Sequence, residues 1–169
     1  LSLVAISPFL TNVVSRVQGY GNGLVTVNGT LDKPNIEGSL HIKDGGCKVG
    51  YLNTFYTFEP TILIDSKSIK FKDMVLVDTL GNKAMVEGPI KHNMLKDFYL
   101  DLRLHPRDFL AMATTSKDND TFYGSAVANG LVAVKGPFKD ILLDIMASTR
   151  KGTHITIPLN RTATVKKHD

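Results

Sequence analysis

Hydrophobic and polar residues alternate along several stretches of this chain. Ile36, Leu40 and Ile42 alternate with polar neighbours, and the same period of two runs from Phe98 to His105 and from His154 to Leu159. Successive side chains of an extended strand point to opposite faces, so each stretch predicts a strand with one apolar and one polar face.

Turn-forming residues separate the alternating stretches, as at Asp32-Lys33-Pro34-Asn35 and Lys151-Gly152. Connections this short favour consecutive antiparallel strands over parallel strands joined by helices. The sequence therefore predicts an all-β, mainly antiparallel meander of about ten to twelve strands. We expect one domain over residues 1–169, with the sheet covering residues 22–160.

One stretch near the start has helical spacing instead. Ser7 stands at a helix-capping position, Pro8 at a first-turn position and Gly19 at a terminating position. The apolar residues between them recur at intervals of three and four. We therefore expect a helix from Pro8 to Gln18, within a capping segment 7–19 that docks on one end of the sheet. Its apolar stripe comprises Phe9, Leu10, Val13, Val14 and Val17.

The chain contains an internal repeat. Residues 22–31 (NGLVTVNGTL) return as residues 129–138 (NGLVAVKGPF), with a weaker copy at 82–90. The spacings are unequal, which argues against a regular solenoid. Glycines recur at positions where an inward side chain is expected, and glycine relieves crowding where a sheet bends. This pattern predicts a sheet that curls into a trough with apolar residues inside.

Composition narrows the class of protein. The chain has 43% hydrophobic and 21% charged residues and a net charge of +4. It lacks a basic stripe interleaved with aromatic residues, so nucleic acid is not an expected partner. A single cysteine, Cys47, excludes a disulfide scaffold. The apolar runs fall far short of the ~20 residues of a membrane-spanning helix. Because Leu1 begins within an apolar run, we expect a fragment of a longer protein.

Motifs that carry catalytic or metal chemistry are weak. The glycines of residues 19–23 follow a predicted helix and precede a strand, the reverse of the dinucleotide-binding order. The five histidines are scattered without metal-site spacing. Asp118 and Asp120 lack the glycine and glutamate of a calcium loop. We therefore expect no enzyme activity, no cofactor and no metal.

Residues 23–38 (GLVTVNGTLDKPNIEG) resemble a unit that recurs in the C-terminal region of TamB-type translocation and assembly modules, relatives of the AsmA-like lipid-transfer proteins. Residues 51–58, 71–84 and 149–159 resemble the Bacteroidetes branch of that family. The resemblance implies a long curled sheet, or β-taco, that is anchored in the inner membrane and crosses the periplasm. It also implies a BAM-like outer-membrane barrel of the TamA class as partner, and roles in phospholipid transport, outer-membrane protein assembly and secretion.

This resemblance suggests that the apolar face is a lipid groove, because burying an acyl chain gains ~0.8 kcal/mol per CH₂ group. The residues by themselves are equally consistent with a dry core that is filled by the protein's own side chains. A second hypothesis is a strand-pairing scaffold or chaperone that uses an open sheet edge for barrel or secreted proteins. A carbohydrate-binding domain ranks below both, because the chain has no Trp. The expected groove residues are Val25, Val27, Ile36, Leu40, Ile42, Ile64, Ile69, Phe71, Val86, Phe98, Leu100, Leu102, Val132, Val134, Leu143 and Ile145.

Overall fold

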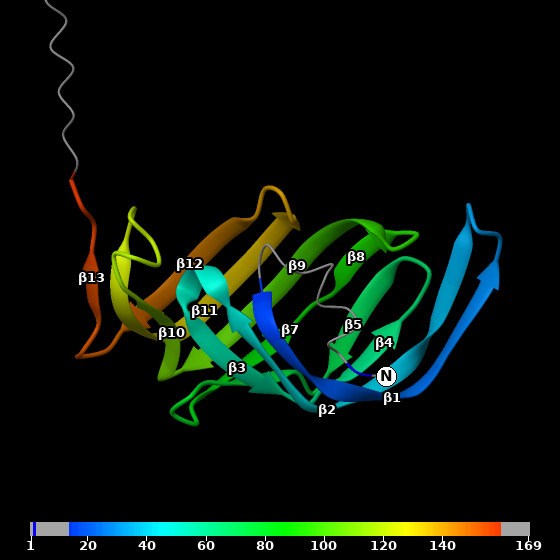
Figure 1. Cartoon of the computed structure of the whole chain (residues 1–169), viewed down its shortest axis with the longest axis horizontal. Coiled ribbons are helices and arrows are strands. Elements are labelled where there is room, and N and C mark those ends of the chain that lie inside the picture. Colours follow the sequence, from blue (N-terminus) through cyan, green and yellow to red (C-terminus); the bar gives the residue numbers. More distant parts are fainter. Residues whose placement is uncertain (1, 3–13, 160–169) are drawn as a thin grey trace, which may run out of the picture.

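A computed structural model describes Ser2 and residues 14–159 of the chain. All of its thirteen strands belong to one antiparallel sheet (Figure 1). The only helical element in this part is a short 3-10 turn, Gly50–Leu52. The expected all-β antiparallel fold is thereby confirmed. The strands are β1 (Val14–Gly29), β2 (Pro34–Val49), β3 (Thr54–Phe58), β4 (Thr61–Ile64), β5 (Ser68–Lys72), β6 (Val75–Val77), β7 (Lys83–Glu87), β8 (Ile90–Asn93), β9 (Lys96–Arg107), β10 (Phe109–Thr114), β11 (Tyr123–Pro137), β12 (Leu142–Thr149) and β13 (His154–Thr156).

Several of these strands are halves of longer ones. β3 and β4 follow each other along the same edge of β2, and β7 and β8 follow each other along β9. In the same way β5 continues into β6, β9 into β10 along β11, and β12 into β13 along β11. With five such pairs joined, the thirteen segments form a simple antiparallel meander of eight long strands.

The irregularities of β2 and the interruptions between β3 and β4, β5 and β6, and β7 and β8 lie on neighbouring strands and crease the sheet. Asp44 in β2 and Asp73 between β5 and β6 both have positive φ, at 53° and 57°. Pro60 and Pro89 interrupt the neighbouring strands at the same level. Backbone bonds still cross the crease, from Ile42 N–H to the Pro60 oxygen at 2.9 Å and from Asp101 N–H to the Pro89 oxygen at 3.1 Å. The crease therefore bends the sheet without dividing it.

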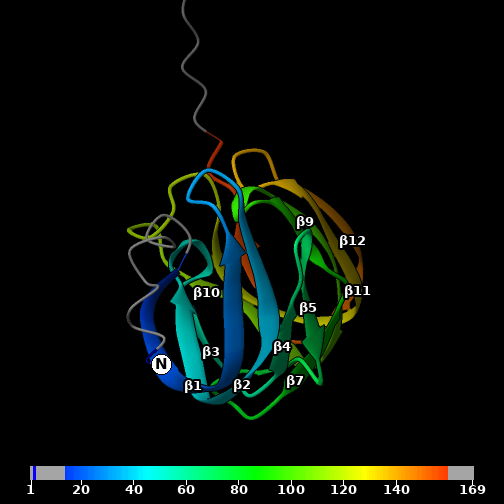
Figure 2. The ribbon, with the colours of Figure 1, turned by 90° about the vertical axis from the view of Figure 1, so that its right-hand side faces the viewer.

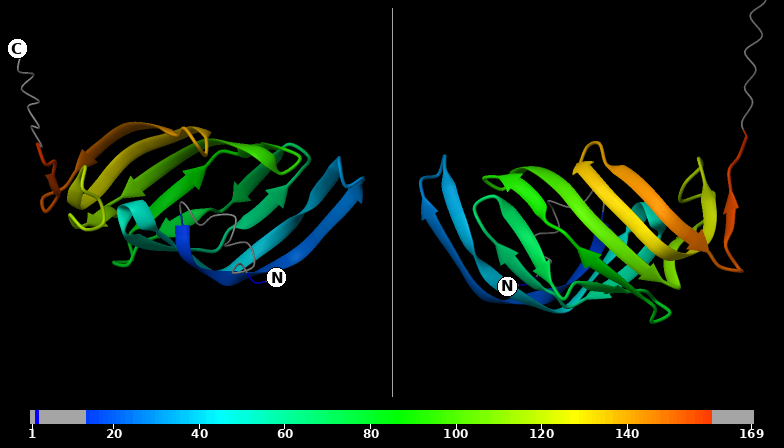
Figure 3. Two further views of the ribbon diagram at one scale, coloured as in Figure 1. Left: turned by 45° about the horizontal axis from the view of Figure 1, so that its top comes forward. Right: turned by 180° about the vertical axis from the view of Figure 1, so that it is seen from behind.

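The bent sheet curls along its width. The view in Figure 2 shows β1 and β2 on one side of the curl and β11 and β12 on the other. Two further views show the β1–β2 and β11–β12 hairpins toward opposite ends of the molecule (Figure 3). The concave face holds a small buried core of Tyr56, Ala84 and Phe109. The Tyr56 and Phe109 rings stack 4.8 Å apart, and the Tyr56 hydroxyl donates a hydrogen bond to the Leu110 carbonyl oxygen at 2.9 Å.

The expected helix from Pro8 to Gln18 is wrong over its C-terminal part. Residues 14–18 belong to β1, where Val14 pairs with Val49 and Gln18 pairs with Gly46. Val14 and Val17 are β-branched and suit a strand, and β2 offers a full row of backbone partners that outweighs the capping signals. Residues 7–13 of the expected capping segment lie outside the described residues. No helix in the described part is long and apolar enough to cross a membrane.

Candidate functional site

The strand register puts the sequence-predicted groove residues on one face of the sheet. Residues directly opposite each other in an antiparallel pair share a face. In the first half of the meander, Val27 lies opposite Ile36, and Ile64 lies opposite Ile69. Leu40 lies opposite Ile62, a residue that was not among the expected ones. The apolar row therefore crosses β1, β2, β4 and β5, with glycine at two of its positions: Gly23 lies opposite Leu40, and Gly38 lies between Val25 and Ile64.

The row continues across the second half. Ile90 of β8 connects the two halves, because it lies opposite Ile69 on one side and Leu100 on the other. Leu102 then lies opposite Val134, which in turn lies opposite Leu143. Register and strand alternation place the remaining expected residues on this same face: Val25, Ile42, Phe71, Val86, Phe98, Val132 and Ile145.

Burial along this face is graded. Ile42, Val86 and Leu100 are buried, whereas most of the other expected residues are half-buried. Three are largely exposed, with accessible fractions of 64% for Val27, 55% for Leu143 and 61% for Ile145. These three lie on β1 and β12, each of which has a neighbouring strand along its length on one side only. Incomplete lateral packing accounts for their exposure.

Sequence reasoning missed the best-buried end of the face. Tyr56, Phe109 and Met112 are 4–5% accessible, and none was expected there. The segment around Tyr56 reads Thr-Phe-Tyr-Thr-Phe, with aromatic residues at both parities, so alternation could not assign its inner face. A buried position raises the pKa of the Tyr56 hydroxyl to about 12, because the tyrosinate anion would lose its hydration.

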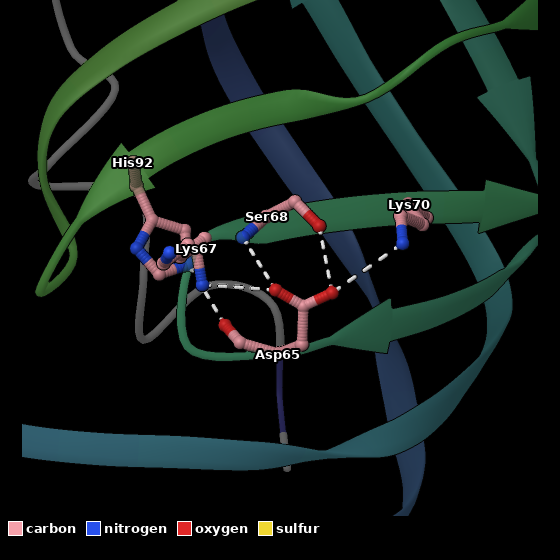
Figure 4. Close-up of polar contacts among 5 residues, drawn as sticks. All are labelled: Asp65, Lys67, Ser68, Lys70 and His92. Atoms are coloured by element: carbon pink, nitrogen blue, oxygen red, sulfur yellow. Dashed lines mark hydrogen bonds and ion pairs between the residues drawn. The ribbon is translucent and has the colours of Figure 1, made fainter.

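Acid, base and hydroxyl side chains do meet at one place, the turn between β4 and β5. Figure 4 shows Asp65, Ser68 and His92 together there. The Asp65 carboxylate accepts the N–H of Lys67 at 2.9 Å, the N–H of Ser68 at 2.7 Å and the hydroxyl of Ser68 at 2.8 Å. These bonds, led by that from Lys67, hold the Asp65 pKa well below its ordinary range.

The geometry of this cluster is that of a structural clamp. A catalytic triad needs the hydroxyl bonded to histidine and the histidine oriented by the carboxylate. Here the Ser68 hydroxyl donates to Asp65 and has no bond to His92. His92 Nδ1 accepts the Leu95 N–H at 3.2 Å, so its Nε2 carries the proton and donates to the Asp65 carbonyl oxygen at 3.1 Å. His92 thus ties the β4–β5 turn to the β8–β9 turn.

Other side chains of reactive types also lie where they do not form a catalytic or metal site. Burial raises the pKa of the Cys47 thiol, which disfavours the reactive thiolate. A hollow of about 510 Å³ lies at the crease. Its lining includes three acidic residues, Asp44, Glu59 and Asp73, together with Lys83. Within the described part of the chain, no three histidine, cysteine or acidic side chains are placed to hold a metal ion.

The chemically distinctive feature of the molecule is therefore its extended apolar face. It is formed by residues from almost every strand of the meander, and it grades from a closed core at Tyr56 to open positions at Val27 and Ile145. Comparison with protein-family models, with curated proteins and with solved structures finds no match to this chain.

Proposed function

We propose that the concave face binds the acyl chains of phospholipids, and that this chain is a section of a lipid-carrying trough. The observation that carries the proposal is the apolar row across the concave face, of which only a part is covered by the protein's own side chains. Among the described residues, no second sheet and no α-helix packs across that row. A face of this kind gains from an apolar partner that removes it from water.

The energetics favour a flexible, elongated ligand. Each methylene group that leaves water contributes about 0.8 kcal/mol, so a chain of several methylenes along the row gains several kcal/mol without any directional bond. The opposite face of the same strands carries the charged residues Lys70, Asp101 and Arg103, and it also exposes Leu24, Leu63 and Met85 to water. Lipid tails can follow the apolar row while the polar headgroup stays at the open side.

The cellular setting of this proposal comes from the family resemblance alone. It is that of a TamB-type protein: a periplasmic region of an inner-membrane-anchored chain, partnered by an outer-membrane barrel of the TamA class. In that setting the trough would move phospholipids toward the outer membrane and support the assembly of its proteins. Covalent chemistry has no part in this mechanism, in keeping with the expectation that the protein is not an enzyme.

Photo-crosslinking tests the proposal with neighbouring positions as matched controls. A diazirine side chain replaces Leu102 on the concave face or Arg103 on the opposite face, and a second pair uses Ile69 and Lys70. The chain is mixed with vesicles of phosphatidylethanolamine and phosphatidylglycerol that carry labelled acyl chains. We expect crosslinks from positions 102 and 69 and few from 103 and 70. Equal labelling of both faces, or none, would overturn lipid binding by this face.

A second candidate function is a strand-pairing scaffold for barrel proteins. It is favoured by β12, which pairs with β11 on one side and has no strand on its other side in the described part of the chain. An unfolded barrel protein that pairs there would be retained by the immobilised chain, and Ile145→Pro would abolish retention because proline removes a ladder donor. Retention that is unchanged by this substitution would eliminate β12 as the pairing site.

A further inference from the structure

Three neighbouring hairpins end at unequal heights along one rim of the sheet. The β4 ladder on β2 ends where Ile64 lies opposite Gly38, so residues 34–37 of β2 and their partners on β1 extend past it. On the other side, the ladder between β5 and β8 ends with Ser68 opposite Lys91, and the β8–β9 turn extends beyond that point. The short β4–β5 hairpin therefore leaves a notch between two taller hairpins.

A hollow of about 200 Å³ lies between the two taller hairpins. One wall comes from the β1–β2 turn and the start of β2, and the other comes from the β8–β9 turn, which lies on the same side of the sheet (Figure 1). Pro34 lines the hollow and stands two positions before Ile36 in a regular part of the ladder, so both share the concave face. The hollow thus lies at the mouth of the apolar face. Its apolar lining residues are Leu31, Pro34 and Met94, and its charged ones are Asp32, Lys96 and Asp97.

The charged side chains of this hollow are free to bind a ligand. Within the part of the chain that the structure describes, Asp32, Lys96 and Asp97 have no ion pair or hydrogen bond through their side chains. Asp65 in the intervening turn differs, because its carboxylate already accepts the Ser68 hydroxyl. A lysine binds a phosphate oxygen as a point charge, and a carboxylate accepts hydrogen bonds from an ammonium group. The hollow therefore offers charges of both signs to one ligand.

Burial on the concave face increases from this rim toward the crease. Val27, beside the β1–β2 turn, is 64% accessible, whereas Leu100 is 8% and Ile42 only 1% accessible. The six residues from Ile36 to Ile42 span ~20 Å at ~3.3 Å per residue. The hydrocarbon core of a bilayer is ~30 Å thick, so the tails of one leaflet are ~15 Å deep. An acyl chain of ordinary length therefore fits along the strands between the hollow and the crease.

We infer that the hollow binds the headgroup of a phospholipid that carries a primary amine, with the acyl chains directed along the strands toward the crease. Lys96 binds the phosphate, and Asp32 and Asp97 accept hydrogen bonds from the ammonium group. A glycerol headgroup lacks the cation that the two carboxylates attract, so it binds less well. This inference rests on the proposed binding of acyl chains and adds to it the class of headgroup and the orientation of the lipid.

Photo-crosslinking measures the headgroup preference. The full chain with a diazirine side chain at position 102 is mixed with vesicles of phosphatidylethanolamine and phosphatidylglycerol in equal amounts, and one of the two lipids carries labelled acyl chains in each experiment. We expect about two- to fivefold more capture of labelled phosphatidylethanolamine, the range of a partly exposed ion pair. Asp32→Asn combined with Asp97→Asn should bring this ratio close to one. Lys96→Gln should lower the capture of both lipids.

Matched controls come from the β11–β12 turn. Asp140→Asn and Lys139→Gln change the same charges outside the hollow, and both should leave the yields and their ratio unchanged. Capture of neither lipid would overturn acyl-chain binding, and this inference with it. Three other results would overturn the headgroup site alone: capture without a preference, a preference that survives both aspartate substitutions, or a preference that Asp140→Asn also removes.

The position of the reactive group on the lipid tests the orientation. Phosphatidylethanolamine with a diazirine near the methyl end of its acyl chain should label Leu40 and Leu102, toward the crease. The same lipid with a diazirine near the ester should label Ile36 and Phe98, which lie closer to the hollow. Mass spectrometry of the digested chain locates the labelled residues. A reversed pattern, or the same residues labelled from both positions, would overturn the orientation.

Discussion

Asp78 provides the sharpest test of how this sheet is held in its curled shape. It lies in the turn between β6 and β7 and is only 6% accessible. Its Oδ1 accepts the N–H groups of Leu80 and Asn82, each at 2.9 Å, within the turn. Its Oδ2 accepts the Leu110 N–H at 2.7 Å, which ties the turn to β10, 32 residues away in sequence. One carboxylate thereby joins two distant parts of the meander beside the buried core.

We expect Asp78→Ala to lower the free energy of unfolding by about 2–4 kcal/mol. A hydrogen bond to a charged acceptor contributes roughly 1.5–3 kcal/mol, and a buried donor left without a partner costs about 1–3 kcal/mol. The exposed turn lets water replace the bonds to Leu80 and Asn82 in part. The half-buried Leu110 amide is the main loss. Asp78→Asn should cost roughly 1–3 kcal/mol, because its amide group presents a donor where one of the carboxylate oxygens accepts.

Urea unfolding followed by circular dichroism measures these losses. For a domain of this size, a loss of 3 kcal/mol moves the unfolding midpoint by roughly 1–3 M urea. Thr79→Ala is the matched control, since Thr79 is the exposed neighbour of Asp78 in the same turn, and its effect should stay within about 0.5 kcal/mol. If Asp78→Ala and Asp78→Asn both fall within that margin of the control, the bond to Leu110 does not hold the fold.

Three further predictions follow from the turns and the core. The pKa of Asp65 is lowered in the folded state, so its carboxylate stabilises the fold above pH ~4 and this stabilisation is lost as the pH falls further. The difference in unfolding free energy between wild type and Asp65→Asn should therefore shrink between about pH 5 and pH 3, and a constant difference in urea titrations would contradict this. Tyr56→Phe should cost about 1 kcal/mol through the lost bond to the Leu110 oxygen. Because burial raises the pKa of Tyr56 to about 12, the part of the stability that depends on its proton is present below pH ~10 and is lost as the pH rises toward 12. Ultraviolet titration should accordingly find one of the five tyrosines ionising late, and Tyr56→Phe should remove that step. Gly88→Ala should destabilise the protein by at least about 2 kcal/mol more than Gly81→Ala. Both glycines have positive φ, but an added Cβ at Gly88 would collide with the Asp101 carbonyl oxygen, whereas the space at Gly81 is open. Equal midpoints for the two glycine variants would show that the crease at Gly88 can relax.

Alternation by itself assigned the inner face of the strands that alternate clearly, though not of β3, where aromatic residues stand at both parities. Ile36, Leu40 and Ile42 share a face because successive side chains in a strand point in opposite directions, and this rule depends only on local backbone geometry. The antiparallel meander followed from short turns for the same reason: a two- to five-residue connection can only join neighbours. Both properties are local in the chain, so the sequence alone determined them.

Contacts between distant residues decided the rest. Val14 and Val17 have helical spacing from Pro8, yet they lie in β1 because β2 supplies their backbone partners. Tyr56 became part of the core through Phe109, more than fifty residues later, and no local period could reveal that contact. The exposure of Ile145 also depends on which strand lies at the edge. Alternation reports the direction of a side chain, whereas burial depends on which other residues the fold brings against it.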